Sequence, residues 1–199
     1  GMTMDAAQGQ ANRAGAARER LAFRRLGFEV WRREIAPLWH MEGAVHLVAP
    51  LVNGYGQLQY CGREIHARVR HVPLAAELDG TRIAWTSIYN ISDEALRLRG
   101  IYVLPEWRSN GIGRALVAHA VSLWPARFGH VFLYARIGNV GRYRRWGFEV
   151  VPGHVPRSHR TGIEGGQERI VQMMLRRGDG AIAGQPRSAA REASGPLPT

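Results

Sequence analysis

Residues 99–116 read RGIYVLPEWRSNGIGRAL and carry the strongest structural signal in the chain. An apolar run at 101–104 predicts a strand, which Pro105 ends because proline cannot donate to a sheet ladder. Gly111 and Gly113 follow, and a helical pattern then covers 115–128. A strand, a glycine-containing turn and a helix start can hold a phosphate, because the first turn of a helix has free N–H groups and partial positive charge.

Gly-x-Gly before a helix is a weak signal by itself, since a tight turn into a helix produces the same pattern. No Gly-Lys-Ser/Thr follows, which excludes a Walker A loop, and the spacing does not fit the dinucleotide pattern G-x-G-x-x-G. Arg108 and Arg114 stand on either side of the glycines and could add charge-assisted hydrogen bonds to an anion. Phosphate binding and a simple turn both stay open at this point.

A second motif, Tyr143-x-x-x-Gly147-Phe148, stands 35 residues after Arg108-x-x-Gly-x-Gly. In this order the two motifs resemble the GNAT family of N-acetyltransferases, over roughly residues 72–176. The resemblance implies an α/β (α+β) fold: a mixed, mostly antiparallel sheet of six to seven strands with helices on both faces. It implies a single acyl-CoA N-acyltransferase domain over 14–177, with the cofactor core at about 72–176 and the acceptor-side segment at about 28–62.

The resemblance also implies acetyl-CoA as the acyl donor, held between two strands, 98–104 and 131–136, that splay apart. The backbone of Tyr102 and Val103 would pair with the pantetheine amides, and the N–H groups of 109–114 would hold the diphosphate. Asn139 stands four residues before Tyr143, where family members often place asparagine seven before, so the short helix is expected to be shortened. The implied cofactor-binding residues are Tyr102, Val103, Arg108, Ser109, Asn110, Gly111, Ile112, Gly113, Arg114 and Asn139.

The implied reaction is direct attack of a primary amine on the thioester within a ternary complex. Tyr143 occupies the family's position for the acid that protonates the leaving thiolate, and its ordinary pKa of about 10 keeps it protonated at neutral pH. Packing beside the cofactor sulfur is the alternative role.

The general base of this reaction stays unassigned. Some family members carry a carboxylate at the position of residues 96–99, where this chain reads Leu-Arg-Leu-Arg. The candidates that remain are His40, Glu42, Tyr89, Glu94 or a chain of waters. The missing carboxylate also keeps open an acyl-CoA-binding sensor of the same fold without transfer activity.

Charge and composition restrict the partners. All 27 basic residues are arginine and the net charge is +11, which suits an anionic cofactor, nucleic acid or membrane headgroups. No run of five basic residues occurs, which disfavours nucleic acid, and no apolar run of 18 residues predicts a membrane span. The partner is therefore expected to be a small-molecule or peptide amine, with a homodimer possible.

Cysteine and histidine give little further chemistry. Cys61 is the only cysteine, which agrees with a reducing, cytoplasmic compartment. His154 and His159 lack a surrounding Cys or carboxylate cluster, so no metal is expected. Their loop, 153–167, is expected to overhang the acceptor, and its Arg and His content hints at an anionic acceptor.

The remaining elements follow from periodicity and turn residues. Asp79-Gly80 predicts a hairpin between strands at 72–78 and 81–91, and residues 1–13 and 178–199 are expected to be disordered. A short helix should start at 138–139, hold Tyr143 and end at Gly147. The other predicted elements are helices over 14–26, with Gly27 as its cap, and 38–51, and strands over 28–35, 64–70, 96–104, 131–135, 148–151 and 169–175.

The chain contains one short internal repeat, which we call the echo. Residues 23–30, FRRLGFEV, and 143–150, YRRWGFEV, match at six of eight positions. A vestigial second acetyltransferase domain is one interpretation. The favoured one is a helix end, a glycine cap and a strand start in both places, since so short a repeat cannot be a domain.

Overall fold

A computed structural model describes residues 7–9, 12–13, 15–16, 19–41, 59–60, 63–64, 70–152, 157–160 and 167–178. In this part of the chain the strands form one eight-stranded sheet and a separate two-stranded one. None of the helices in these ranges is long and apolar enough to cross a membrane.

The main sheet is mixed and mostly antiparallel, as expected, and its path runs β1-β4-β5-β6-β7-β10-β8, with β9 paired to β10. Only β6 and β7 pair in parallel among the described ladders. The strands are β1 (Leu21–Arg25), β4 (His71–Leu78), β5 (Thr81–Asn90), β6 (Ala95–Val103), β7 (His130–Arg136), β8 (Glu149–Val150), β9 (Arg157–Arg160) and β10 (Gln167–Arg176), and the small sheet pairs β2 (Gln59–Tyr60) with β3 (Arg63–Glu64).

The β4–β5 hairpin turns where the sequence predicts it. Asp79 and Gly80 have φ values of 50° and 82°, and a two-residue turn with positive φ at both positions matches the twist of the strands. Both strands are buried along most of their length, because helices cover both faces of the sheet.

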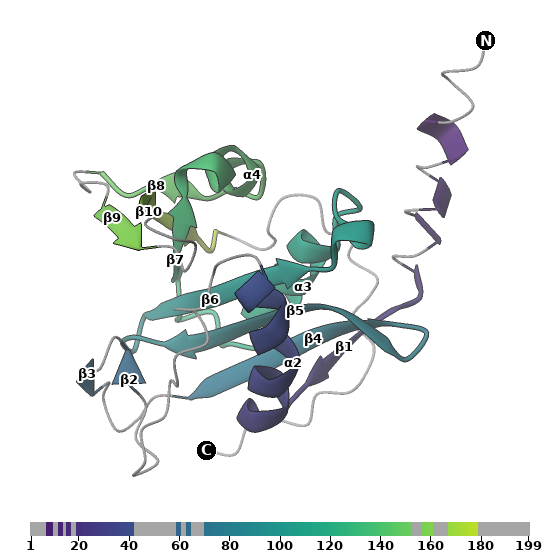
Figure 1. The fold of residues 1–199 in the computed structure, drawn as a ribbon. Coiled ribbons are helices and arrows are strands. Elements are labelled where there is room, and N and C mark those ends of the chain that lie inside the picture. The colour runs from purple at the N-terminus through teal and green to yellow at the C-terminus, as the bar shows by residue number, and fades with distance from the viewer. Residues whose placement is uncertain are drawn as a thin grey trace.

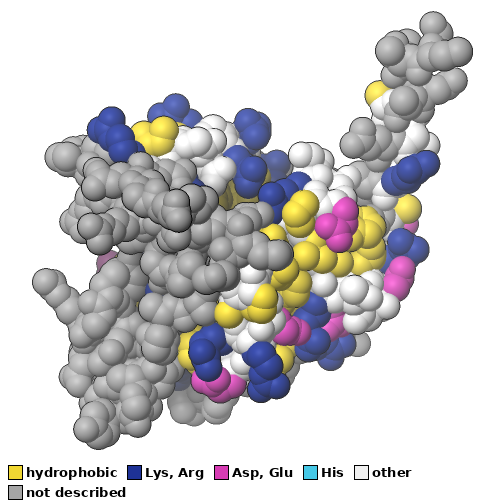
Figure 2. Space-filling view, in the orientation of Figure 1, with side chains coloured by type: hydrophobic (Ala, Val, Ile, Leu, Met, Phe, Trp, Pro, Cys, Tyr) yellow, Lys and Arg dark blue, Asp and Glu magenta, His cyan; other side chains and the backbone are white. Residues whose placement is uncertain are grey.

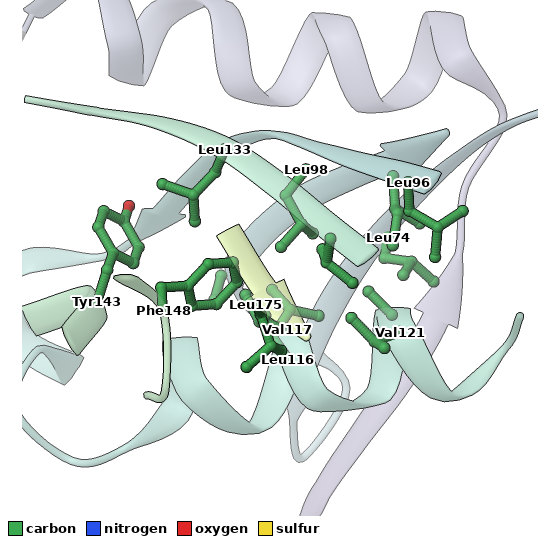
Figure 3. Close-up of a cluster of buried hydrophobic side chains, with 14 of the residues drawn as sticks. Leu74, Leu96, Leu98, Leu116, Val117, Val121, Leu133, Tyr143, Phe148 and Leu175 are labelled. Carbon is green, nitrogen blue, oxygen red and sulfur yellow. The ribbon is translucent and has the colours of Figure 1, made fainter. Parts of the chain in front are cut away.

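The two covering helices lie on opposite faces of the sheet, with α2 (Phe28–Met41) in front and α3 (Ile112–Ser122) behind in the view of Figure 1. On the α2 face, Trp31 and Ile35 pack with Ala75, Trp85 and Tyr102. The larger core lies on the α3 face, and Figure 3 shows ten of its members labelled, among them Leu96 and Leu98 of β6 opposite Leu116, Val117 and Val121 of α3.

β6 and β7 separate soon after they begin, and the region where the two strands diverge is called the splay. Their parallel pairing covers only Ala95, Leu96 and Arg97 opposite His130, Val131 and Phe132. Beyond these pairs β6 continues beside β5, while β7 continues beside β10. Figure 1 shows β7, β8 and β10 leaving the plane of the other strands. The splay expected from the resemblance is therefore present.

The N-terminal segment contradicts two predictions. Residues 15–16 and 19 are helical, but Leu21–Arg25 is strand β1 on the edge of β4, and Gly27 has no positive φ. Residues 28–35, predicted as a strand, begin helix α2. Alternation of apolar residues with Arg and Glu suggested a strand, whereas Trp31, Ile35 and Leu38 recur at the spacing of one helix face.

The echo also contradicts its favoured interpretation. Residues 143–150 do run from helix through Gly147, at φ 97°, into β8. Residues 23–30 run the other way, from β1 into α2. Phe23 pairs with Ala76 of β4 and stacks on His119 of α3 at 4.5 Å between ring centroids. Nearly identical octapeptides therefore adopt opposite structures because their tertiary partners differ.

Several boundaries differ from the expected ones. The helix predicted over 115–128 starts at Ile112 and ends at Ser122, and Pro125 lies just beyond it. The predicted loop over 153–167 contains β9. Residues 7–9 and 12–13, expected to lack structure, are helical. Of the helix predicted over 38–51, residues 38–41 belong to α2 and the rest lie outside the described residues, as do 65–69 of the predicted strand over 64–70 and the predicted tail beyond 178.

Candidate active site

The turn before α3 has an unusual backbone. Ser109 and Gly111 have φ values of 66° and 74°, and the side-chain amide Nδ2 of Asn110 between them donates to the carbonyls of Trp107 and Arg108, each at 3.2 Å. A non-glycine residue in the left-handed region is uncommon and is found where the surroundings or a function require it. Gly111 in the left-handed and Ile112 in the right-handed conformation form a backbone concavity of the kind that binds anions.

The first turn of α3 leaves its N–H groups directed toward this concavity. No side chain caps Gly111, and the first helical bond runs from the amide of Ala115 to the carbonyl of Gly111 at 3.0 Å. The helix has no acidic residue in its first turn and instead carries Arg114, whose charge opposes the helix dipole. An anion bound at this end would accept hydrogen bonds from the free N–H groups. Its negative charge would also offset the repulsion between Arg114 and the helix dipole.

Gly113 has a packing role that the motif does not reveal. A Cβ at this position would lie 3.2 Å from Cη2 of Trp146 and 3.3 Å from Cγ2 of Val103. The missing side chain therefore lets α3 approach both β6 and the end of α4 (Val140–Arg145). Gly113 therefore lies where the turn approaches both sides of the splay, with Val103 on the β6 side and Trp146 on the α4 side.

Arg108 links the turn to the strand. It lies after the 3-10 helix η2 (Pro105–Trp107), its Nε donates to the carbonyl of Val103 at 2.9 Å, and its guanidinium lies 5.2 Å from the centre of the Tyr102 ring. The structure thus brings together three residues that the resemblance assigns to the cofactor. A pantetheine amide bonding to this carbonyl would share or replace the Arg108 bond.

A β-bulge that sequence reasoning missed lies at Gly100. Thr86 pairs with Ile101 and Ser87 with Arg99, which leaves Gly100 as the extra residue, with φ 69°. The hydroxyls of Thr86 and Ser87 donate to the carbonyls of Gly100 and Arg99 at 2.7 and 2.9 Å. Bulges bend a strand and increase its twist, so this bulge changes the direction of the part of β6 that faces the splay. A glycine inside a predicted strand was the available signal.

Tyr143 lies on α4, on the β7 side of the splay. Its ring packs edge-on against Trp146 at 5.2 Å and Phe148 at 6.1 Å between centroids. Figure 3 shows it beside Phe148 at the outer end of the core, with the hydroxyl pointing away from Leu116 and Val117. Burial raises the pKa of Tyr143, and Arg142 and Arg136 only partly oppose this. The phenol is therefore protonated at neutral pH.

Asn139 lies at the start of α4. It ends the short helix η3 (Ile137–Asn139), which follows β7 directly, and its side chain makes no cap bond. Asn139 and Tyr143 thus come from the β7 side of the splay, whereas residues 108–114 come from the β6 side. The predicted cofactor and acid residues lie on both sides of the splay.

Of the candidate general bases, the structure describes the side chains of Tyr89 and Glu94 only. Tyr89 is buried on β5, and Glu94 is exposed in the β5–β6 turn, at the paired end of β6 and β7 and far along β6 from Val103. Glu42, Cys61 and the side chains of His40, His154 and His159 lie outside the described residues. Within the described ranges no group of three or more His, Cys, Asp or Glu could hold a metal ion.

Comparison with known proteins agrees with this geometry. A profile of the Acetyltransferase (GNAT) family matches residues 39–148. No curated protein matches the sequence.

Solved structures with a similar fold share little sequence with this chain. They include the IAA acetyltransferase from Bacillus cereus ATCC 14579 (13% identity, TM-score 0.52, 78% of this chain and 99% of that one). A mutant form of the spermidine/spermine N-acetyltransferase SpeG from Vibrio cholerae is also similar (16%, 0.54, 79% and 94%). The ribosomal-protein-S18-alanine N-acetyltransferase from Escherichia coli is a third (17%, 0.51, 84% and 97%). At these identities the likeness shows the fold alone, but the family profile spans more than half of the sequence, and the chain belongs to the GNAT acetyltransferase family.

Proposed function

We propose that this protein is an acetyl-CoA-dependent N-acetyltransferase that transfers the acetyl group to a primary amine by direct attack in a ternary complex. The observation that carries the proposal is the splay of β6 and β7, with an uncapped helix N-terminus on one side and a buried, protonated tyrosine on the other. Membership of the GNAT family supports the same reaction class.

The turn residues would bind the anionic end of the donor. The N–H groups of residues 109–114 would receive the diphosphate, and Arg108 and Arg114 would add charge-assisted hydrogen bonds. The backbone of Tyr102 and Val103 would hold the pantetheine arm in the splay, and Asn139 would contact the arm from the β7 side. A backbone N–H of β6 would stabilise the charge that develops on the thioester oxygen.

In the chemical step the neutral amine attacks the thioester carbon. The C–N bond forms, the C–S bond breaks, and the thiolate takes its proton from the hydroxyl of Tyr143. The attacking nitrogen loses a proton to a base that the described residues do not identify. Holding both substrates in one complex supplies much of the rate, up to about 7–11 kcal/mol for well-oriented reactants.

Acetyl-CoA binding to the turn is the test. We expect acetyl-CoA to raise the melting temperature of the protein, and Gly111→Trp to abolish this shift by filling the anion site. Gly80→Trp is the matched control, because Gly80 has a similar positive φ and open space around it. The control separates backbone strain from loss of the site. A missing shift with the intact protein would contradict the proposal, and a shift without turnover of any amine would favour an acyl-CoA sensor of the same fold.

A further inference from the structure

The carbonyl of Val103 points into the splay. The amide of Leu104 donates to the carbonyl of Ile83 on β5 at 2.9 Å. In a planar trans peptide unit the N–H and the C=O point in opposite directions, so the carbonyl of Val103 points away from β5. The pairing of β6 with β7 ends at Arg97. Among the described strands, none therefore pairs with this edge of β6 at Val103.

Arg108 occupies this carbonyl. Its Nε donates to the carbonyl oxygen of Val103 at 2.9 Å, and its guanidinium lies 5.2 Å from the centre of the Tyr102 ring. The guanidinium is therefore engaged by the strand rather than free. Arg108 is nevertheless exposed, as is Ser109 after it, so a ligand can reach both from solvent.

A diphosphate is a stronger partner for this guanidinium than a carbonyl is. Arg108 directly precedes Ser109, the first residue of the turn proposed to hold the diphosphate. A charged acceptor attracts a guanidinium more strongly than a neutral one, and phosphate oxygens can accept two parallel N–H bonds from it. A diphosphate bound at the turn should therefore draw the guanidinium away from Val103.

The carbonyl that this movement frees is one that the donor needs. An extended ligand can add to an unpaired strand edge through main-chain hydrogen bonds, and the pantetheine arm has amide N–H groups that can make them. While Arg108 stays on Val103, a pantetheine amide has to compete for the same oxygen. A thioester without a diphosphate has no group with which to move Arg108.

We infer that Arg108 makes the donor site selective for thioesters that carry a diphosphate: the diphosphate takes the guanidinium, and the carbonyl of Val103 then accepts a pantetheine amide. The inference rests on the proposed acetyl transfer, and it adds to diphosphate binding an exchange of partners at Val103. Only hydrogen bonds are exchanged. Short pantetheine thioesters should therefore bind poorly, although they contain every group that the splay would hold.

Binding of S-acetylpantetheine to the full-length protein, measured by calorimetry, tests the exchange. This probe carries the thioester and the amides but no phosphate. We expect millimolar inorganic pyrophosphate to lower its Kd at least tenfold, because pyrophosphate binds at the turn and takes Arg108. Sodium chloride at the same ionic strength should not lower it. A Kd that pyrophosphate leaves unchanged or raises would overturn the inference.

Two variants separate the exchange from simple loss of charge. Arg108→Met keeps an unbranched side chain beside Tyr102 and removes the guanidinium. It should bind S-acetylpantetheine at least tenfold more tightly than the wild-type protein, with no further gain from pyrophosphate, and acetyl-CoA more weakly. Arg114→Gln is the matched comparison, because it removes a charge from the first turn of α3 but leaves the bond from Arg108 to Val103. It should weaken acetyl-CoA binding without strengthening S-acetylpantetheine binding.

The outcomes distinguish this inference from the proposed function. Equal strengthening of S-acetylpantetheine binding by both variants would show a general effect of charge and overturn the inference. So would an Arg108→Met protein that binds the probe no better than the wild type, including the case in which neither binds it. Melting without ligand checks that the variants fold, and if Arg108→Met does not, the pyrophosphate effect on the wild-type protein decides. A wild-type melting temperature that acetyl-CoA does not raise would instead refute the proposed function.

Discussion

Tyr143 combines burial with a polar group that has a chemical role in the proposal. Its ring belongs to the main core, yet its hydroxyl points away from the α3 side chains. Tyr143→Phe keeps the ring contacts with Trp146 and Phe148 and removes only the acid. We expect kcat to fall at least tenfold with little change in KM for acetyl-CoA, as general acids contribute about 100-fold or more. Steady-state thiol release measures both, and unchanged turnover would leave Tyr143 a packing residue.

The raised pKa of Tyr143 also predicts the form of the pH profile. An acid is active while protonated, so activity should be lost as pH rises through its pKa. Because burial moves this pKa above its ordinary value of 10.0, we expect no loss of kcat from this group between pH 7 and 9. A loss centred below pH 9 that disappears in Tyr143→Phe would contradict the assignment of the pKa shift.

His71 makes stability depend on pH in the acid range. Its folded-state pKa of about 4 lies below the ordinary histidine value of 6.5, so the unfolded chain binds more protons between these values. Stability is complete above pH 6.5 and falls as pH drops toward 4, by roughly 3 kcal/mol in total. His71→Phe should remove most of this slope in urea unfolding at pH 4.5 and 7. His119, whose pKa is also lowered, adds a smaller slope of the same sign, and an undiminished slope in the variant would refute the prediction.

At the scale of elements, the helix–strand junctions depend on close approach. Gly113 brings α3 against Val103 and Trp146, and an added methyl would meet both at 3.2–3.3 Å. We expect Gly113→Ala to destabilise the protein by about 1–3 kcal/mol, as overpacking does. Gly138→Ala is the control, since a Cβ there meets nothing within 4 Å. Urea unfolding at pH 7 measures both variants, and equal stabilities would mean that the junction relaxes at no cost.

The two copies of the echo show the limit of element prediction. Both contain Arg-Arg, a hydrophobic residue and Gly-Phe-Glu-Val in the same order, so local propensity cannot separate them. In the second copy Gly147 adopts positive φ and ends α4. In the first copy β1 has the edge of β4 to pair with, and Leu26 is buried beside Trp31. Non-local pairing overrides the local signal, as it often does in sheets.

At the scale of the whole molecule, the net charge of +11 belongs to a protein whose proposed donor is an anion. Figure 2 shows arginine side chains on the part of the surface that contains α4, which carries Arg142, Arg144 and Arg145. Screening shortens the reach of these charges from about 10 Å at 0.1 M salt to about 3 Å at 1 M.

Acetyl-CoA affinity should therefore fall with salt. We expect the Kd measured by calorimetry to rise severalfold between 50 and 500 mM NaCl. Arg114→Gln should reduce this dependence because it removes a charge from the first turn of α3, while Arg32→Gln, at a half-exposed position of α2, should not. A Kd that is independent of salt would contradict diphosphate binding at the turn.

Signals within a few residues of one another were enough to predict much of the middle of the chain. Pro105 and Gly111 separate β6 from α3, and Asp79-Gly80 makes the β4–β5 hairpin, because proline and positive-φ residues restrict the backbone locally. The predicted turn and the predicted tyrosine also lie where the motifs suggested, on the two sides of the splay.

The sequence by itself determined the order strand, turn, helix around Pro105 and Gly111, because this order depends on the conformational limits of single residues. Only the tertiary structure decided that residues 21–25 form a strand and 28–41 a helix, since each requires a partner distant in the chain. It also decided that β6 is bulged at Gly100 and that Arg97 and Arg99 lie on the α2 face. The two faces of a strand differ in burial only when helices cover them, so the surroundings of each β6 side chain depend on the packed fold.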